Sequence, residues 1–147
     1  MVTLFHLLFS VCIVGSSPSG QITQEDIQNL TENTFILKSQ KLKEEVWPEV
    51  NVKAYLKASP LEAIAIFAAY DLQQTYVPNL VSSKVVKQDP PNEAHVDYKM
   101  DLPWPLGYSY YIHGHKLTQP KKNSYQVSWY LVKSDAAEDV RGVALFE

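Results

Sequence analysis

The segment that most constrains the fold runs from residue 93 to residue 117, where two strand-like runs flank a proline-rich turn. In the first run, apolar side chains alternate with polar ones, which is the period of a strand with one buried face. Pro103, Pro105 and Gly107 then interrupt any ladder, because proline donates no backbone hydrogen bond and glycine adopts backbone angles that other residues avoid. Alternation resumes at Tyr108. The segment therefore predicts an antiparallel pair of strands with an aromatic-rich surface.

Elements on both sides of this pair follow from alternation and from capping residues. Further strands are predicted at 36–46, 50–58, 81–87, 124–132 and 141–147, with a polar turn at 118–123. Thr23 and Asp26 favour a short N-terminal helix, since the acid lies in the first turn near the positive end of the helix dipole. The Ser-Pro-Leu-Glu sequence at 59–62 is typical of a helix start and predicts a helix at 61–70.

The order of these elements predicts an α+β fold, with a curved antiparallel sheet and a buried helix after the second strand. The helix at 61–70 is apolar almost all round, so we expect it to be buried on more than one side. The apolar concave face of the sheet lacks a predicted cover, and the strand pattern is unfinished at Glu147. We expect either a partner over that face or a native chain that continues past Glu147.

The first residues differ from the rest of the chain. Residues 1–14 are nearly all apolar, and residues 15–20 are small or turn-forming. This is typical of a secretory signal peptide and too short to span a bilayer. We expect a signal peptide at 1–20, a domain at 21–147, a secreted or periplasmic protein and no transmembrane segment after cleavage. Cys12 is the only cysteine and would leave with the signal peptide, so neither disulfides nor thiol chemistry are expected.

Composition argues against one class of partner. The chain has 147 residues, 46% of them hydrophobic, and a formal net charge of −3 with both signs mixed throughout. This length and apolar content are enough for one domain with a core. Lys and Arg are not clustered into a basic stretch of the kind that binds nucleic acid, so nucleic acid is not expected as a partner. The sequence does not identify a protein partner.

Three segments between Val52 and Gly107 resemble the START-like, helix-grip superfamily of lipid-binding and polyketide-cyclase-like domains. They are a strand running into the Ser-Pro-capped helix at 52–64, the stretch at 70–86, and Leu-Pro-Trp-Pro-Leu at 102–106. In that family the sheet wraps around a long C-terminal helix, with a hydrophobic ligand between them. The resemblance implies a cavity lined by inward strand faces. It also implies that this chain is incomplete at its C-terminus, because the last strands and the lid helix are absent from it.

The inward aromatic residues are the main candidate site. We expect Tyr108, Tyr110 and Ile112 to face the interior, which would turn His113 and His115 toward solvent. The set can equally be ordinary core packing, and the two interpretations are compatible. The residues predicted to bind the ligand are Leu56, Tyr98, Met100, Tyr110, Ile112, Trp129 and Leu131. Trp104, held between prolines, is expected to pack the turn.

A metal site is the weaker alternative. His113 and His115 lie two apart on a strand, and His95 could join them from the neighbouring strand. No carboxylate is placed to complete such a site, so neither a metal nor another cofactor is expected.

We expect the chain to bind a lipid or other hydrophobic small molecule in a cavity between the concave sheet face and helices. Two alternatives remain: a cyclase or hydrolase-type enzyme on the same fold, and a protein-interaction module that uses the uncovered sheet face. The sequence contains no nucleophile elbow, no metal constellation and no glycine-rich phosphate loop. No catalytic residue is predicted.

Overall fold

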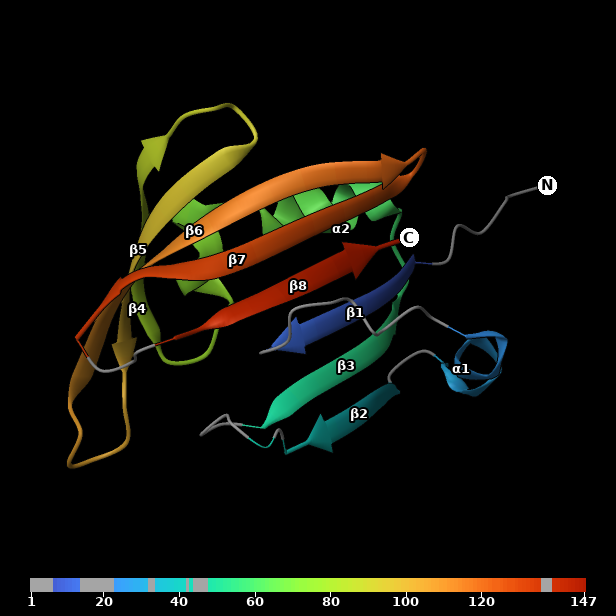
Figure 1. Ribbon diagram of the computed structural model, residues 1–147, viewed down its shortest axis with the longest axis horizontal. Helices are drawn as coiled ribbons and strands as arrows, with labels where there is room; N and C mark the ends of the chain where they lie inside the picture. Colours follow the sequence, from blue (N-terminus) through green and yellow to red (C-terminus); the bar gives the residue numbers. More distant parts are fainter. Residues whose placement is uncertain (1–6, 14–22, 32–33, 42, 44–47, 136–138) are drawn as a thin grey trace.

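The computed structural model describes residues 7–13, 23–31, 34–41, 43, 48–135 and 139–147, and it has one curved antiparallel sheet with short helices (Figure 1). The strands are β1 Leu7–Ile13, β2 Phe35–Gln40, β3 Glu49–Leu56, β4 Leu80–Gln88, β5 Glu93–Asp101, β6 Tyr108–Lys121, β7 Ser124–Ser134 and β8 Arg141–Phe146. The helices are α1 Gln24–Asn29, α2 Pro60–Phe67 and the 3-10 helix η1 Tyr70–Thr75. No helix in these ranges is long and apolar enough to cross a membrane. The predicted fold class is confirmed.

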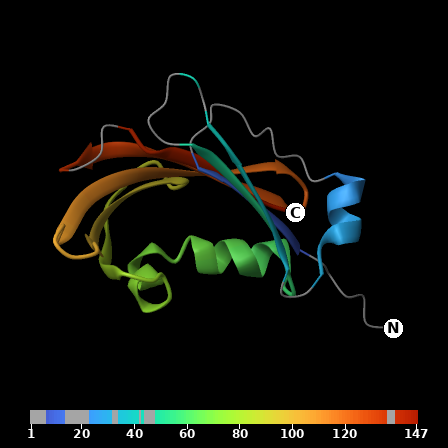
Figure 2. The same ribbon diagram turned by 90° about the horizontal axis from the view of Figure 1, so that it is seen from below.

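The strand order places the start of the chain inside the sheet. Along the sheet the strands run β2-β3-β1-β8-β7-β6-β5-β4, and all neighbours are antiparallel. The link from β3 to β4 must therefore cross nearly the whole sheet. It does so through α2 and η1, which lie in the hollow of the curved sheet (Figure 2).

Most strand predictions agree with the structure, and the exceptions have local causes. The turn predicted at 118–123 is shorter in the structure, at 122–123, because β6 continues to Lys121. Pro120 is accommodated where the β6–β7 register shifts between Thr118 and Lys121, an irregularity of the kind at which proline is tolerated in sheets. The outer strand β2 ends at Gln40 rather than at residue 46, and residues 44–47 lie outside the described ranges.

Helix α2 begins as the sequence predicts. The Ser59 hydroxyl accepts a hydrogen bond from the backbone N–H of Glu62 at 3.2 Å, and the Glu62 carboxylate accepts one from the backbone N–H of Ser59 at 2.8 Å. Pro60 occupies the first turn, where its missing N–H costs nothing. The reciprocal bonds satisfy two donors that a helix start would otherwise leave unpaired.

Only one side of α2 is buried. Ala63 and Ile64 pack on the sheet, whereas Leu61 and Ile66 are each 61% exposed. The prediction that this helix is buried on more than one side is therefore wrong. Its apolar sequence reflects one packed face and an outer face that no described segment covers.

The concave side of the sheet holds two separate clusters of buried apolar side chains. The first joins α2 to the C-terminal strands and contains Ala63, Ile64, Val127, Ala144 and Phe146. The second joins η1 to the β4–β5 end and contains Tyr70, Leu80, Ala94, Val96 and Tyr98. The helical connection therefore covers part of the face that we expected to find bare.

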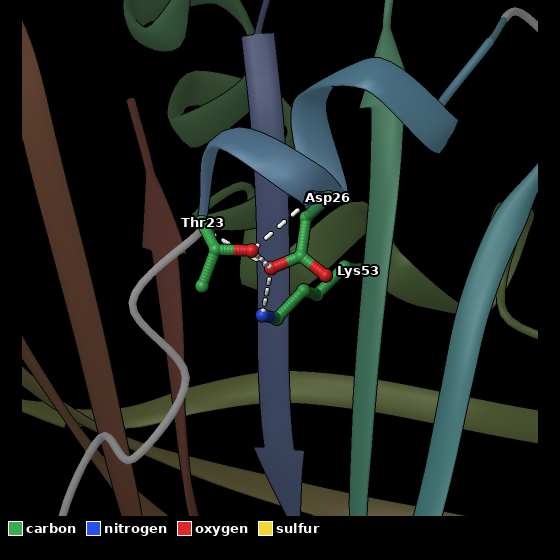
Figure 3. Close-up of polar contacts among 3 residues, drawn as sticks. All are labelled: Thr23, Asp26 and Lys53. Atoms are coloured by element: carbon green, nitrogen blue, oxygen red, sulfur yellow. Dashed lines mark hydrogen bonds and ion pairs between the residues drawn. The ribbon is translucent and has the colours of Figure 1, made fainter.

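Helix α1 lies on the opposite, convex side, where a buried ion pair holds it to β3 (Figures 2 and 3). The Lys53 ammonium lies 2.5 Å from the Asp26 carboxylate, and both side chains are less than 10% exposed. Asp26 also accepts hydrogen bonds from the backbone N–H and the hydroxyl of Thr23, both at 2.8 Å. The hydrogen bond from Lys53, followed by that from the Thr23 backbone, holds the Asp26 pKa well below its usual value.

Strand β1 lies within the segment predicted to be a signal peptide. Its backbone pairs with β3 on one side, where Val11 is opposite Val52, and with β8 on the other, where Val11 is opposite Ala144. A mature chain that starts after residue 20 would lack this strand. Cleavage at residue 20 stays a prediction. If it occurs, β3 and β8 lose the strand that lies between them.

The ion pair gives a pH-dependent prediction. Because the folded pKa of Asp26 is depressed, its stabilising contribution is present above the ordinary pKa of 3.8 and is lost as the pH falls below that value. We expect Asp26→Asn to lower the free energy of unfolding by about 3 kcal/mol at pH 7. Urea unfolding should show this deficit shrinking as the pH falls below 3.8. The exposed neighbour Glu25→Gln is the control, and a deficit that does not change with pH would contradict the assignment.

The second prediction concerns β1. Deleting residues 1–20 from a cytoplasmically expressed chain should remove the backbone partner of both β3 and β8, so we expect a loss of several kcal/mol in the free energy of unfolding. Urea unfolding of the full and shortened chains measures it. N-terminal sequencing of the protein recovered from an exporting host is the companion experiment. A shortened chain as stable as the full one would contradict β1 as an integral strand and would favour the signal peptide.

Candidate ligand-binding site

The register between β5 and β6 decides which side chains face the hollow. Tyr98 is opposite Tyr111, Val96 is opposite His113, and Ala94 is opposite His115. Directly opposite residues in an antiparallel pair share a face. Tyr98 belongs to the buried cluster beneath η1, so all of these pairs point to the concave side.

The prediction that Tyr108, Tyr110 and Ile112 face inward is therefore wrong. Tyr110 is opposite Lys99 and Ile112 is opposite Asp97, which places both on the convex face. Tyr110 is 49% exposed, and the Lys99 ammonium lies 4.0 Å from the centre of the Tyr108 ring. Aromatic residues occur at both odd and even positions of β6, so the alternation of side chains could not tell which face of the strand is buried. Pairing with β5 makes the choice.

His113 and His115 consequently face inward, against the prediction that they are exposed. The His115 side chain lies against Tyr70, with ring centres 4.6 Å apart, and the residue is only 5% exposed. Burial lowers the pKa of His113 to about 4, and burial together with the neighbouring His113 lowers that of His115 to about 3. Both rings are therefore neutral near pH 7.

A chain of hydrogen bonds ties His115 to the helical connection. The Tyr98 hydroxyl lies 3.1 Å from Nε2 of His115 and donates to Oε1 of Gln73 at 2.7 Å. Nε2 of Gln73 donates to the carbonyl of Phe67 at 3.0 Å. Burial raises the pKa of Tyr98, so this hydroxyl keeps its proton. Nδ1 of His115 is buried and has no hydrogen-bond partner in the described part of the chain.

Next to this chain lies a cavity of about 430 Å³, between the α2–η1 segment and strands β4 to β6. Its wall combines apolar and polar residues, among them Tyr70, Asp71, Glu93, Ala94, His115 and Leu117. Among the described residues that line it, none is Lys or Arg. The cavity is within the range of about 300–1,000 Å³ typical of small-molecule sites.

The seven residues predicted to bind the ligand do not come together here. Tyr98 does not line the cavity, but its hydroxyl is hydrogen-bonded to His115, which does. Trp129 packs against Phe67, with ring centres 6.3 Å apart, in the other cluster. Leu131 is opposite the inward-facing His113, Met100 is opposite Ser109 at the turn end of β5, and Leu56 ends β3. Among the described residues that line the cavity, none is from the predicted set.

Sequence reasoning missed the residues that do line the cavity. Tyr70 and Asp71 lie in η1, where no periodic pattern points to a site. His115 was identified but placed on the wrong face. The sequence did hold one clue, the alternation in β5, where Val96 and Tyr98 are on the buried face. Once the hairpin register is known, these two residues determine which side of β6 faces inward.

The positions of His95 and Trp104 test two further predictions, the alternative metal site and the packing of the turn. His95 is opposite Gly114 on the convex face, so it does not converge with His113 and His115 on one metal ion. Within the described ranges, no group of three or more His, Cys, Asp or Glu side chains is arranged to hold a metal. Trp104 is 93% exposed, so the prediction that it packs the turn is wrong.

Comparison with known proteins supports the fold. No family model matches the sequence, and no curated protein matches it. The structure is similar to that of a STAR-related lipid transfer protein (fragment 25–204) from Xanthomonas axonopodis, with a TM-score of 0.63 and 11% sequence identity over 78% of this chain and 76% of that one. At this identity the likeness shows the fold, which is START-like, as the sequence resemblance implied.

The buried histidines predict a loss of stability in mild acid. Because the folded pKa of His115 lies below the ordinary 6.5, the unfolded chain takes up a proton first, and stability falls as the pH drops below 6.5. Between pH 6.5 and about pH 5 this residue should account for about 2 kcal/mol. We expect His115→Gln to remove that part of the loss in urea unfolding.

The Asp26→Asn variant is the control for this measurement, since its own pH window begins only below 3.8. It should keep the full loss between pH 6.5 and about pH 5. An unchanged loss in His115→Gln would show that His115 is not buried in its neutral form.

Proposed function

We propose that this chain binds a lipid or other hydrophobic small molecule, without chemistry, in the cavity between the α2–η1 segment and strands β4 to β6. The observation that carries the proposal is a cavity of about 430 Å³ on the concave side of the sheet, next to a buried apolar cluster. Apolar walls with a few placed polar groups favour ligands of this class, because burial of apolar surface supplies affinity and the polar groups fix orientation.

The fold gives independent support. The similar solved structure is that of a lipid transfer protein, and the likeness covers most of both chains. The cavity lies on the concave face of the sheet, the face on which the START-like resemblance implies a ligand, but here the α2–η1 segment covers it rather than a C-terminal helix. Binding rather than catalysis is proposed because the buried titratable groups are poorly suited to proton transfer near pH 7: the low pKa values of His113 and His115 make both rings weak bases, and Tyr98 keeps its proton.

The first experiment is native mass spectrometry of the full chain, followed by extraction of bound molecules and a titration with the neutral apolar dye Nile red. We expect either a co-purifying apolar molecule or Nile red binding with enhanced fluorescence. Ala69→Phe, which places a ring in the cavity wall, should weaken Nile red binding about tenfold.

The matched control is Ala65→Phe, the same substitution on the exposed side of α2. It should bind Nile red as the wild type does. Absence of any bound molecule together with equal Nile red titrations of the two variants would contradict the proposal.

A further inference from the structure

The two outer strands of the sheet, β2 and β4, differ in how their free edges are protected. A free edge offers unpaired backbone groups to another strand, and proteins usually block it with bulges, charges or a covering segment. The pairing of β4 with β5 is irregular between Leu80 and Ser82 and between Val85 and Lys87. The backbone N–H of Val85 also donates to the Asp71 carboxylate at 2.8 Å, so η1 covers part of this edge. Further pairing through β4 is therefore hindered.

Strand β2 has a regular backbone and an open outer edge in the described part of the chain. It is the outermost strand beside β3 and forms the lower border of the sheet in Figure 1. Its register with β3 is uninterrupted from Phe35, opposite Ala54, to Gln40, opposite Glu49. Lys38 is its one charged residue. The outer backbone groups of β2 can therefore pair with a further strand.

The apolar side chains of β2 lie mainly on one face. Ile36 is opposite Lys53, whose ammonium binds α1 on the convex side. Opposite residues share a face and neighbours alternate, so Phe35 and Leu37 are on the concave side. Phe35 is 65% exposed and Leu37 is 57% exposed. A strand that covers this patch must bring apolar side chains at alternating positions of the same face.

A second copy of β2 meets this requirement in one register. With Leu37 opposite Leu37 in an antiparallel pair, Phe35 is opposite Ser39 and Ile36 is opposite Lys38, so every position from 35 to 39 is paired and the apolar patches of both copies merge. One alternative that keeps the faces matched puts Lys38 opposite Lys38, where like charges repel. The other puts Ile36 opposite Ile36 and leaves only positions 35–37 of the strand paired.

We propose that β2 pairs antiparallel with β2 of a second copy, about a two-fold axis at Leu37, so that the sheets of the two copies join edge to edge. The inference goes beyond the proposed function and does not depend on it. An isologous contact of this kind closes after two copies, and the hindered edge at β4 does not extend the assembly. An unrelated extended peptide would form the backbone bonds without matching the patch of Phe35 and Leu37.

Sedimentation velocity of the full chain between about 1 and 100 µM tests the pairing. We expect a monomer–dimer equilibrium with a dissociation constant of about 10 µM, because a pair of short strands buries less surface than a typical stable interface. Leu37→Glu and Leu37→Lys each bring two like charges opposite each other and should weaken the dimer about tenfold or more. An equal mixture of the two variants places opposite charges there and should restore it.

The matched control is Ile66→Glu, since Ile66 is an apolar residue of similar exposure, 61%, on the outer face of α2. It should dimerise as the wild type does. A wild type that stays monomeric over the whole range would overturn the proposal. So would a dimer that the Leu37 variants keep, or one that Ile66→Glu loses.

Cysteine substitution tests the register without adding charge. Cys12, the only cysteine, is first replaced by Cys12→Ser. Leu37→Cys then places two thiols directly opposite each other, within the Cα separation of about 4.4–6.8 Å that a disulfide spans. Mild oxidation should give a covalent dimer on a non-reducing gel.

Ser39→Cys in the same background is the control for the register. Its two copies would lie on opposite sides of the two-fold axis, about 13 Å apart along the strands, which is too far for a disulfide. It should stay monomeric on the gel. Cross-linking of Ser39→Cys as efficient as that of Leu37→Cys, or no cross-linking of Leu37→Cys, would contradict the proposed pairing.

Discussion

The register of the β5–β6 hairpin is the constraint on which the rest of the site depends. The two strands meet through a turn that contains two prolines and Gly107, whose φ of +74° is a conformation that other residues rarely adopt. The pairing that follows places Tyr98 and His115 on the concave face. A shift by one residue would carry every side chain of β6 to the other face. The cavity and its hydrogen-bond chain would then both be lost.

The strand arrangement explains why the site forms at one end of the sheet. The chain must pass from β3 to β4 at the opposite edge, and the only covering segments on the concave side in the described residues are α2 and η1, which make this crossing. Helix α2 packs tightly on β7 and β8 through Ala63 and Ile64. Past its end, the irregular turn into η1 leaves a gap against β5 and β6, and that gap is the cavity.

Local signals predicted the fold better than the site. Alternation and the Ser59 capping box identified the α+β class, most strands and the start of α2, because those patterns depend on neighbours in sequence. The facing of β6 could not be predicted in the same way, since Tyr110 and Tyr111 are equally suited to a buried position. The ion pair between Asp26 and Lys53 was also beyond reach, because it joins residues whose proximity depends on the sheet order.

On the convex face, Gly114 leaves room for the side chain of Tyr130. A side chain at this position would collide with the ring of Tyr130, which therefore needs glycine there to lie across the strand. From that position the Tyr130 hydroxyl reaches over β6 and donates to Glu93, and this bond raises the pKa of Tyr130. Strand β6 thus presents His115 on its concave face and, on its convex face, leaves the space in which Tyr130 holds the Glu93 carboxylate.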